Sequence, residues 1–189
     1  PHNLKEVCGA VVHFIDHPTC TVQDLMINIP APDFPTGGII MGTSGIKEAY
    51  ATGRGKLVVR ARTSIEDFKN RQRIIVTEIP YQVNKSQLIE EIAELVKDKK
   101  IQGISDLRDE SDREGMRIVI ELKTGANSDV VLNQLFQHSR LQTTFGVIML
   151  ALDGNEPQIM PLKTIIEKFV LHRQDVVRKR TAFELKEAE

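Results

Sequence analysis

The chain has 189 residues, of which 41% are hydrophobic and 27% charged, and its formal net charge is −1. This length suits one domain or two small ones, and the near-neutral charge requires any nucleic-acid surface to be a local patch. No apolar run approaches the roughly 20 residues of a membrane helix, no signal peptide is recognisable, and the two cysteines form no metal-binding pattern. We therefore expect a cytoplasmic protein without membrane contact. Because the sequence starts at Pro1, we interpret it as a fragment of a longer polypeptide.

The first 30 residues predict two helices. Apolar residues recur at helical spacing over 4–15, and His17-Pro18 ends that pattern. Thr21 and Asp24 mark the start of a short second helix that runs to about Ile27. Three prolines at 30, 32 and 35 then predict an extended connector. We assign 1–30 to the trailing helices of an upstream unit and its linker.

The next segment predicts a β-hairpin behind a glycine-rich stretch. Residues 37–56 contain six glycines around a short helical piece at 46–50. Residues 57–63 and 73–79 are rich in β-formers, and the polar segment 65–72 between them resembles a turn. The two strands are expected to form a long hairpin.

From residue 73 the expected order is strand 73–79, helix 85–98, strand 101–107, strand 116–122, helix 129–138 and strand 145–150. Asn84 and Ser128 are the expected N-caps of the two helices. This β-α-β-β-α-β order predicts a ferredoxin-like unit within an α+β fold, covering 31–160 together with the added hairpin. A long helix is expected over 161–189, where Leu162, Phe169, Val176 and Phe183 recur every seven residues.

Candidate enzymatic side chains are sparse. His13 and His17 have the spacing of a metal pair but straddle a helix end, and a metal site is the less favoured interpretation. The charged stretch 106–114, which ends at Glu114, is either a divalent-metal site or a solvated turn, and we favour the turn. Packing is the expected role of Tyr50 and Tyr81. We assign no catalytic and no metal-binding residue.

Basic residues gather between positions 37 and 62, where only Glu48 opposes them. Arg54 and Lys56 flank Gly55, which would let phosphates approach the backbone closely. Arg60 and Arg62 alternate with apolar residues and should share one face of a strand. Such a strip suits phosphate contacts without base recognition, but a solvated hairpin face explains it equally well. The candidate DNA-binding residues, with Lys85 at a helix N-terminus, are Arg54, Lys56, Lys85, Arg60, Arg62 and Lys47.

Several motifs closely resemble the breakage-reunion subunit of bacterial type IIA topoisomerases, with the gyrase branch the better match and topoisomerase IV second. The resemblance covers the whole chain and rests on EIPYQVNK at 78–85, TGRGK at 52–56, PDFPT at 32–36, DLRDESD at 106–112, GMRIVI at 115–120 and PHNL at 1–4. It implies the tower domain over 31–160, with the winged-helix region before it and the start of a coiled-coil arm at 161–189. One departure is Thr43-Ser44, where relatives often carry arginines.

The resemblance also implies a function for the parent protein. Such enzymes break both DNA strands with one tyrosine per subunit and pass a second duplex through during ATP-dependent supercoiling. The family's nucleophile and DNA-bending isoleucine precede Pro1, so Tyr50, Tyr81 and Ile46 do not inherit those roles, and the fragment should be inactive alone. The implied partners are double-stranded DNA, a gyrase B-like ATPase/TOPRIM subunit, and a second copy of the breakage-reunion subunit. The fragment itself needs no cofactor, since the gyrase B-like partner binds Mg²⁺ and ATP.

The alternative hypothesis is a ferredoxin-like module that binds a ligand or another protein, with the helix at 161–189 as a dimer arm. Ferredoxin-like folds host many functions, so topology does not exclude it. A ligand-sized apolar pocket would favour this alternative, whereas a basic concave face near Arg54 and Lys85 would favour the topoisomerase hypothesis.

Overall fold

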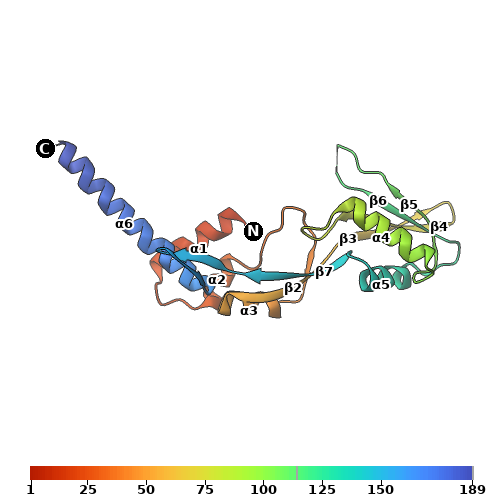
Figure 1. The fold of residues 1–189 in the computed structure, drawn as a ribbon, viewed down its shortest axis with the longest axis horizontal. Helices are drawn as coiled ribbons and strands as arrows, with labels where there is room; N and C mark the ends of the chain where they lie inside the picture. The colour runs from red at the N-terminus through yellow and green to blue at the C-terminus, as the bar shows by residue number, and fades with distance from the viewer. Residues whose placement is uncertain (114, 189) are drawn as a thin grey trace. The chain divides into compact units, whose positions relative to one another are not determined.

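The structure is a computed structural model that describes residues 1–113 and 115–188 (Figure 1). Contacts between residues divide the chain into two compact units. Unit 1 comprises residues 1–33, 43–56 and those from 146 on, and unit 2 comprises residues 34–42 and 57–145. Strands β2 (Arg54–Arg60) and β7 (Gln142–Ile148) contribute residues to both units. The predicted assignments of 1–30, 31–160 and 161–189 stay predictions.

Unit 1 is mainly helical. Helices α1 (Leu4–Asp16) and α3 (Ser44–Thr52) contact the first turns of α6 (Leu162–Ala188), and α2 (Val22–Asn28) packs on α1. Asn3 caps α1. Thr21 and Asp24 form a capping box at the start of α2, which is where the sequence predicted that this helix begins. The predicted long helix is confirmed from Leu162 to Ala188, and its proposed last residue, Glu189, lies outside the described residues.

Unit 1 also contains a hairpin that the sequence reasoning missed. Strands β8 (Leu150–Asp153) and β9 (Glu156–Ile159) pair antiparallel and are joined by Gly154 and Asn155. Gly154 has a φ of +64°, a conformation that glycine adopts without strain. The sequence predicted no strand between 151 and 160, because the two strands are only four residues long.

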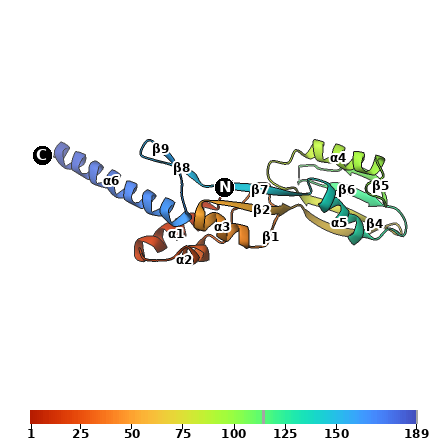
Figure 2. The same ribbon diagram turned by 60° about the horizontal axis from the view of Figure 1, so that its bottom comes forward.

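Unit 2 is built on a four-stranded antiparallel sheet of order β3-β4-β6-β5. Figure 2 shows helices α4 and α5 beside strands of this sheet. Its elements are β3 (Arg62–Phe68), β4 (Arg71–Glu78), α4 (Lys85–Lys97), β5 (Ile104–Asp109), β6 (Ile118–Leu122) and α5 (Ser128–His138). Alternate residues such as Ile74 and Ile120, which pair across β4 and β6, are fully buried against Leu88 of α4 and Leu135 of α5. One face of the sheet therefore forms the core with the two helices.

The α+β class is confirmed, and the elements follow in the predicted order. The sheet nevertheless departs from a ferredoxin-like one, in which the strand after the second helix would pair with β4. That position is taken by β3, and β7 instead joins β2 and β1 (Ile39–Met41) in a three-stranded sheet of order β1-β2-β7. The predicted hairpin exists, but β3 rather than 57–63 forms its first strand.

The turn of this hairpin explains the difference. Lys69 and Asn70 have φ angles of +46° and +63°, the signature of a two-residue turn that brings β3 directly against β4. The segment 65–68 looked turn-like because it lies in an edge strand with polar side chains. Similarly, Asn127 rather than Ser128 caps α5, since its side chain accepts the backbone N–H groups of Asp129 and Val130.

No helix in the described ranges is long and apolar enough to cross a membrane.

Candidate nucleic-acid interface

Arg54 and Lys56 lie at the start of β2, beside a groove of about 440 Å³ in unit 1. Helix α3 ends at Gly53, whose φ of +81° turns the chain into β2. The Thr52 hydroxyl stabilises this turn, since it donates to the Arg54 carbonyl oxygen at 2.8 Å and accepts the Arg54 N–H at 3.2 Å. The other lining residues are Glu48 and Gly55 with Gly146, Val147 and Ile148 of β7.

The groove and its margin carry three exposed cations. Arg54 and Lys56 line the groove, and Lys47 of α3 neighbours the lining residue Glu48. None of these three cations forms an ion pair with a carboxylate among the residues that the structure describes. They can therefore meet a phosphate without breaking an existing pair.

Gly55 has a structural role at this site. A Cβ atom on Gly55 would lie 2.5 Å from the Gly45 carbonyl oxygen and 2.8 Å from the Ala49 Cβ. Because both neighbours belong to α3, the glycine is what lets β2 pack closely on that helix. The sequence suggested that phosphates approach the backbone closely at Gly55, but in the structure it is α3 that does so.

The predicted basic strip of Arg60 and Arg62 is not found. The chain passes from β2 to β3 at Ala61, whose N–H donates to the Leu141 carbonyl, so the two arginines belong to different strands. Arg60 donates to the Gln142 side chain and lies 4.8 Å from the Phe136 ring centroid. Arg62 is ion-paired with Glu78 at 3.0 Å. Both guanidinium groups are already engaged.

Glu78, the first residue of the EIPYQVNK motif, organises the neighbouring loop of unit 2. Its carboxylate accepts the Gly38 N–H at 2.6 Å and pairs with Arg62. The Gly38 N–H, with a smaller contribution from Arg62, holds the Glu78 pKa below its ordinary value. A Cβ on Gly37 would collide with this carboxylate. The sequence reasoning missed this role because nothing local links residues 40 positions apart.

Lys85 begins α4 as predicted, where the Asn84 side chain caps the helix by accepting the Gln87 N–H. Its ammonium is 2.6 Å from the Asp109 carboxylate at the end of β5. This bond, and the hydroxyl and N–H of Ser111, lower the pKa of Asp109 to about 2. A phosphate would have to compete with Asp109. Of the six predicted residues, three lie in unit 1 and Arg60, Arg62 and Lys85 lie in unit 2.

Both tyrosines are packing residues in the structure, which agrees with the sequence interpretation. Tyr50 is fully buried, its hydroxyl is 2.8 Å from His2 Nε2, and burial raises the pKa of its phenol. Tyr81 stacks on Phe34, with ring centroids 5.5 Å apart, and meets Phe145 edge-on. A phenol that is harder to ionise is a poor nucleophile.

The open face of the unit 2 sheet carries a network of paired charges. Arg73 and Arg117 both bind Glu66, at 2.8 and 3.1 Å, and Arg108 binds Asp106, Glu110 and Glu121. The carboxylates of the 106–114 stretch that the structure describes are thus engaged with protein groups, and Glu114 lies outside the described residues. Within 1–113 and 115–188, no three acidic, histidine or cysteine side chains converge as metal ligands. His13 and His17 stack on each other, with ring centroids 4.9 Å apart.

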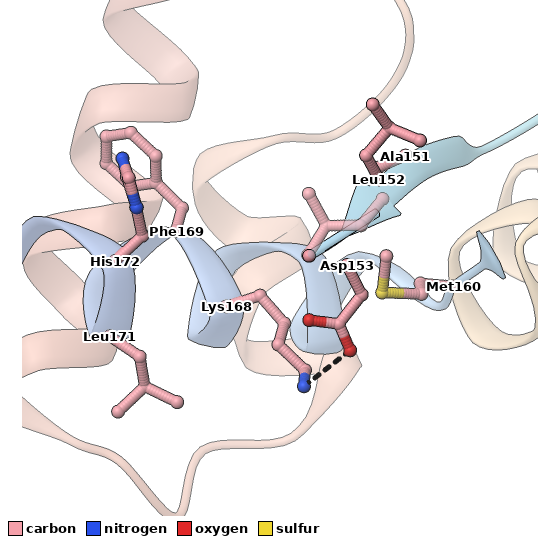
Figure 3. Close-up of a pocket in the computed structure, with 10 residues that line it drawn as sticks. Ala151, Leu152, Asp153, Met160, Lys168, Phe169, Leu171 and His172 are labelled. Atoms are coloured by element: carbon pink, nitrogen blue, oxygen red, sulfur yellow. Dashed lines mark ion pairs between the residues drawn. The ribbon is translucent and has the colours of Figure 1, made fainter. Parts of the chain in front are cut away.

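A larger hollow of about 730 Å³ lies between β8 and α6 in unit 1 (Figure 3). Its walls include Leu152, Met160 and Phe169, and its cation Lys168 reaches the Asp153 carboxylate at 2.7 Å. Because that charge is neutralised, this hollow lacks the free cations of the Arg54–Lys56 groove.

Comparison with known proteins identifies the family. All 189 residues match the family that comprises the A subunits of DNA gyrase and topoisomerase IV. The chain is 58% identical over 189 residues to the DNA gyrase A subunit of Clostridium acetobutylicum, and 56% identical to that of Halalkalibacterium halodurans over 189 residues. It is also 56% identical over 190 residues to the Escherichia coli K12 protein. These matches cover 100% of this chain but 23%, 23% and 22% of the relatives, so the chain spans less than a quarter of their length. With every residue matched and more than half identical, this chain belongs to the family of DNA gyrase and topoisomerase IV A subunits.

Proposed function

We propose that this chain is the tower portion of the DNA breakage-reunion subunit of a gyrase-like type IIA topoisomerase. It supports duplex DNA by phosphate contacts and links the cleavage core to a helical gate through α6. The family match along the whole chain is the observation that carries this proposal. The parent enzyme would change DNA topology in the cytoplasm by ATP-dependent strand passage.

We assign the chemistry of strand breakage to a part of the parent enzyme other than this chain. Tyr50 is fully buried and burial raises the pKa of its phenol, Tyr81 stacks on Phe34, and we expect the chain alone to be inactive. Among the described residues, no three acidic, histidine or cysteine side chains could hold a metal ion together. By analogy with the family, we assign Mg²⁺ and ATP to a gyrase B-like partner subunit. The other proposed partners are double-stranded DNA and a second copy of the breakage-reunion subunit.

The DNA contact is best supported at the Arg54–Lys56 groove. Arg54, Lys56 and Lys47 are exposed, and they form no ion pair with a described carboxylate, unlike Arg62 and Lys85. Such cations neutralise phosphates and release counterions, which gives affinity without base recognition. We expect Arg60, Arg62 and Lys85 to contribute less, because each would first have to leave its present partner.

The test is the salt dependence of duplex binding by the full-length protein. Arg54→Ala/Lys56→Ala should flatten the plot of log affinity against log salt by about two units, roughly one per lost phosphate contact. The matched control is Lys97→Ala/Lys100→Ala, which removes two charges from exposed residues of unit 2 near the end of α4. A slope equal to that of the parent protein would remove Arg54 and Lys56 from the DNA contact.

One observation bears on the alternative hypothesis of a ligand-binding or protein-interaction module. An apolar groove of about 520 Å³ lies between α1 and α6, lined by Leu4, Val7, Cys8, Val11, Val12, Ile165, Ile166 and Phe169. It lies in unit 1, whereas the β-α-β-β-α elements that would form the ferredoxin-like module lie in unit 2. An apolar groove between two helices suits the packing of a further helix. A subunit of a larger assembly would also present such a groove, so the groove does not favour the alternative over the topoisomerase hypothesis.

A further inference from the structure

A second basic groove lies in unit 2, at the tip of the β3–β4 hairpin. Its volume is about 530 Å³, and it lies between the hairpin turn and the loop that leads from β6 to α5. The hairpin contributes Lys69 and Arg71, and the loop contributes Lys123. We call it the hairpin groove. None of these residues was among the predicted DNA contacts.

The hairpin groove carries uncompensated positive charge. Lys69, Arg71 and Lys123 are exposed, and no ion pair joins any of them to a carboxylate among the described residues. The acidic lining residue is Asp67, which accepts the Gln72 side-chain amide at 3.3 Å. Three cations against one carboxylate leave an excess of two positive charges.

The neighbouring sheet shows that free cations are not the rule in unit 2. Arg73, Arg108 and Arg117 are all paired with glutamates of the same sheet, Glu66 and Glu121. Pairing of this kind removes most of a cation's attraction for an external anion. The three hairpin-groove cations differ because no ion pair joins them to a carboxylate in the part of the chain that the structure describes.

The tip is held in shape by the chain itself. The two-residue turn at Lys69 and Asn70 fixes the end of the hairpin. The Phe68 ring is covered by the Arg73 guanidinium at 4.6 Å and the Lys69 ammonium at 5.1 Å, measured to the ring centroid. A base stacking on this ring would have to compete with these two cations.

We propose that the hairpin groove is a second contact for the phosphate backbone of duplex DNA, distinct from the Arg54–Lys56 groove. This inference rests on the proposed function. Exposed lysine and arginine side chains suit phosphate contact, whereas sites for single strands stack successive bases on several aromatic side chains, and Phe68 is the one aromatic residue among the described lining residues. Each phosphate neutralised at the groove adds roughly 0.9 to the salt slope of binding.

The test again measures duplex binding by the full-length protein. Lys69→Gln/Arg71→Gln should flatten the salt slope by about two units, and Lys123→Gln, on a different loop, by about one. Lys97→Gln/Lys100→Gln is the matched control and should leave the slope unchanged. Because all three groove residues are exposed, the thermal unfolding midpoint of each variant should equal that of the parent. If the double variant fails to fold, the salt slope of Lys123→Gln alone tests the proposed DNA contact.

The outcomes separate this inference from the proposed function. If the hairpin variants keep the parent slope while Arg54→Ala/Lys56→Ala flattens it, the proposed function stands and the hairpin contact is refuted. If neither set changes the slope, both are refuted. If the hairpin variants keep the DNA slope but lose binding to polyglutamate, the groove takes an acidic protein segment and the inference is overturned.

Discussion

Gly55 illustrates how a single missing side chain determines where a strand can lie. An added Cβ would meet the Gly45 carbonyl oxygen at 2.5 Å and the Ala49 N atom at 2.9 Å, and backbone atoms cannot move aside cheaply. Gly55→Ala should therefore lower the free energy of unfolding by about 1–3 kcal/mol, as overpacked sites do. Chemical denaturation of the chain measures this.

Gly146 provides the matched control, since it lines the same groove but has no atom within 4 Å of an added Cβ. Gly146→Ala should leave the stability unchanged or raise it slightly, because alanine reduces the freedom of the unfolded chain. Equal effects of the two substitutions would contradict the packing role of Gly55.

Residue-level prediction from the sequence succeeded where the signal is local. The caps at Thr21 and Asn84 each accept an N–H group three positions along the chain, so their residue types reveal them. The engagement of Arg62 and Lys85 depends on Glu78 and Asp109, which are distant in sequence and were not foreseeable. The candidate site was therefore predicted as a set of cations, without knowledge of which ones are free.

At the scale of elements, the Lys85–Asp109 pair ties the start of α4 to the end of β5. The pKa of Asp109 lies at about 2, below its ordinary value of 3.8. A depressed folded-state pKa means that the pair's contribution is complete above about pH 4 and is lost as the pH falls toward 2. At neutral pH Lys85→Met should cost at most about 1 kcal/mol, because both side chains are about one-third exposed and screened by water.

Unfolding measured at pH 7 and at pH 2 tests this dependence. The stability difference between the parent chain and Lys85→Met should shrink toward zero at pH 2, where Asp109 is half-protonated or more. Lys97→Met, at the other end of α4, is the control, and its difference should not vary with pH in this way. A pH-independent effect of Lys85→Met would show that lost packing rather than the ion pair is responsible.

At the scale of the whole molecule, element order was predictable but strand partners were not. Helices α4 and α5 and their flanking strands have apolar periodicity that can be read locally, although the cap of α5 was predicted one residue too late. The placement of β7 beside β2, instead of beside β4, depends on which strand occupies the β4 edge. Local periodicity carries no information about that choice, because β3 and β7 are both short strands of mixed polarity.

The division into two compact units predicts that each can lose structure by itself. Leu135 lies in the unit 2 core and Leu25 in unit 1, and both are fully buried. A buried leucine-to-alanine change costs about 2–5 kcal/mol. If the units open separately, Leu135→Ala should speed hydrogen exchange in β4, β6 and α5 by roughly 30-fold to several thousand-fold, while α1 and α3 keep their protection.

Leu25→Ala should produce the converse pattern, with faster exchange in α1, α2 and α3 and unchanged exchange in β4 and β6. In each variant, hydrogen exchange in the unchanged unit is the reference for exchange in the unit that carries the substitution. Equal acceleration in both units by either variant would mean that the chain unfolds as one cooperative body. Strands β2 and β7 belong to both units, so their exchange should rise in both variants and report how far each opening extends.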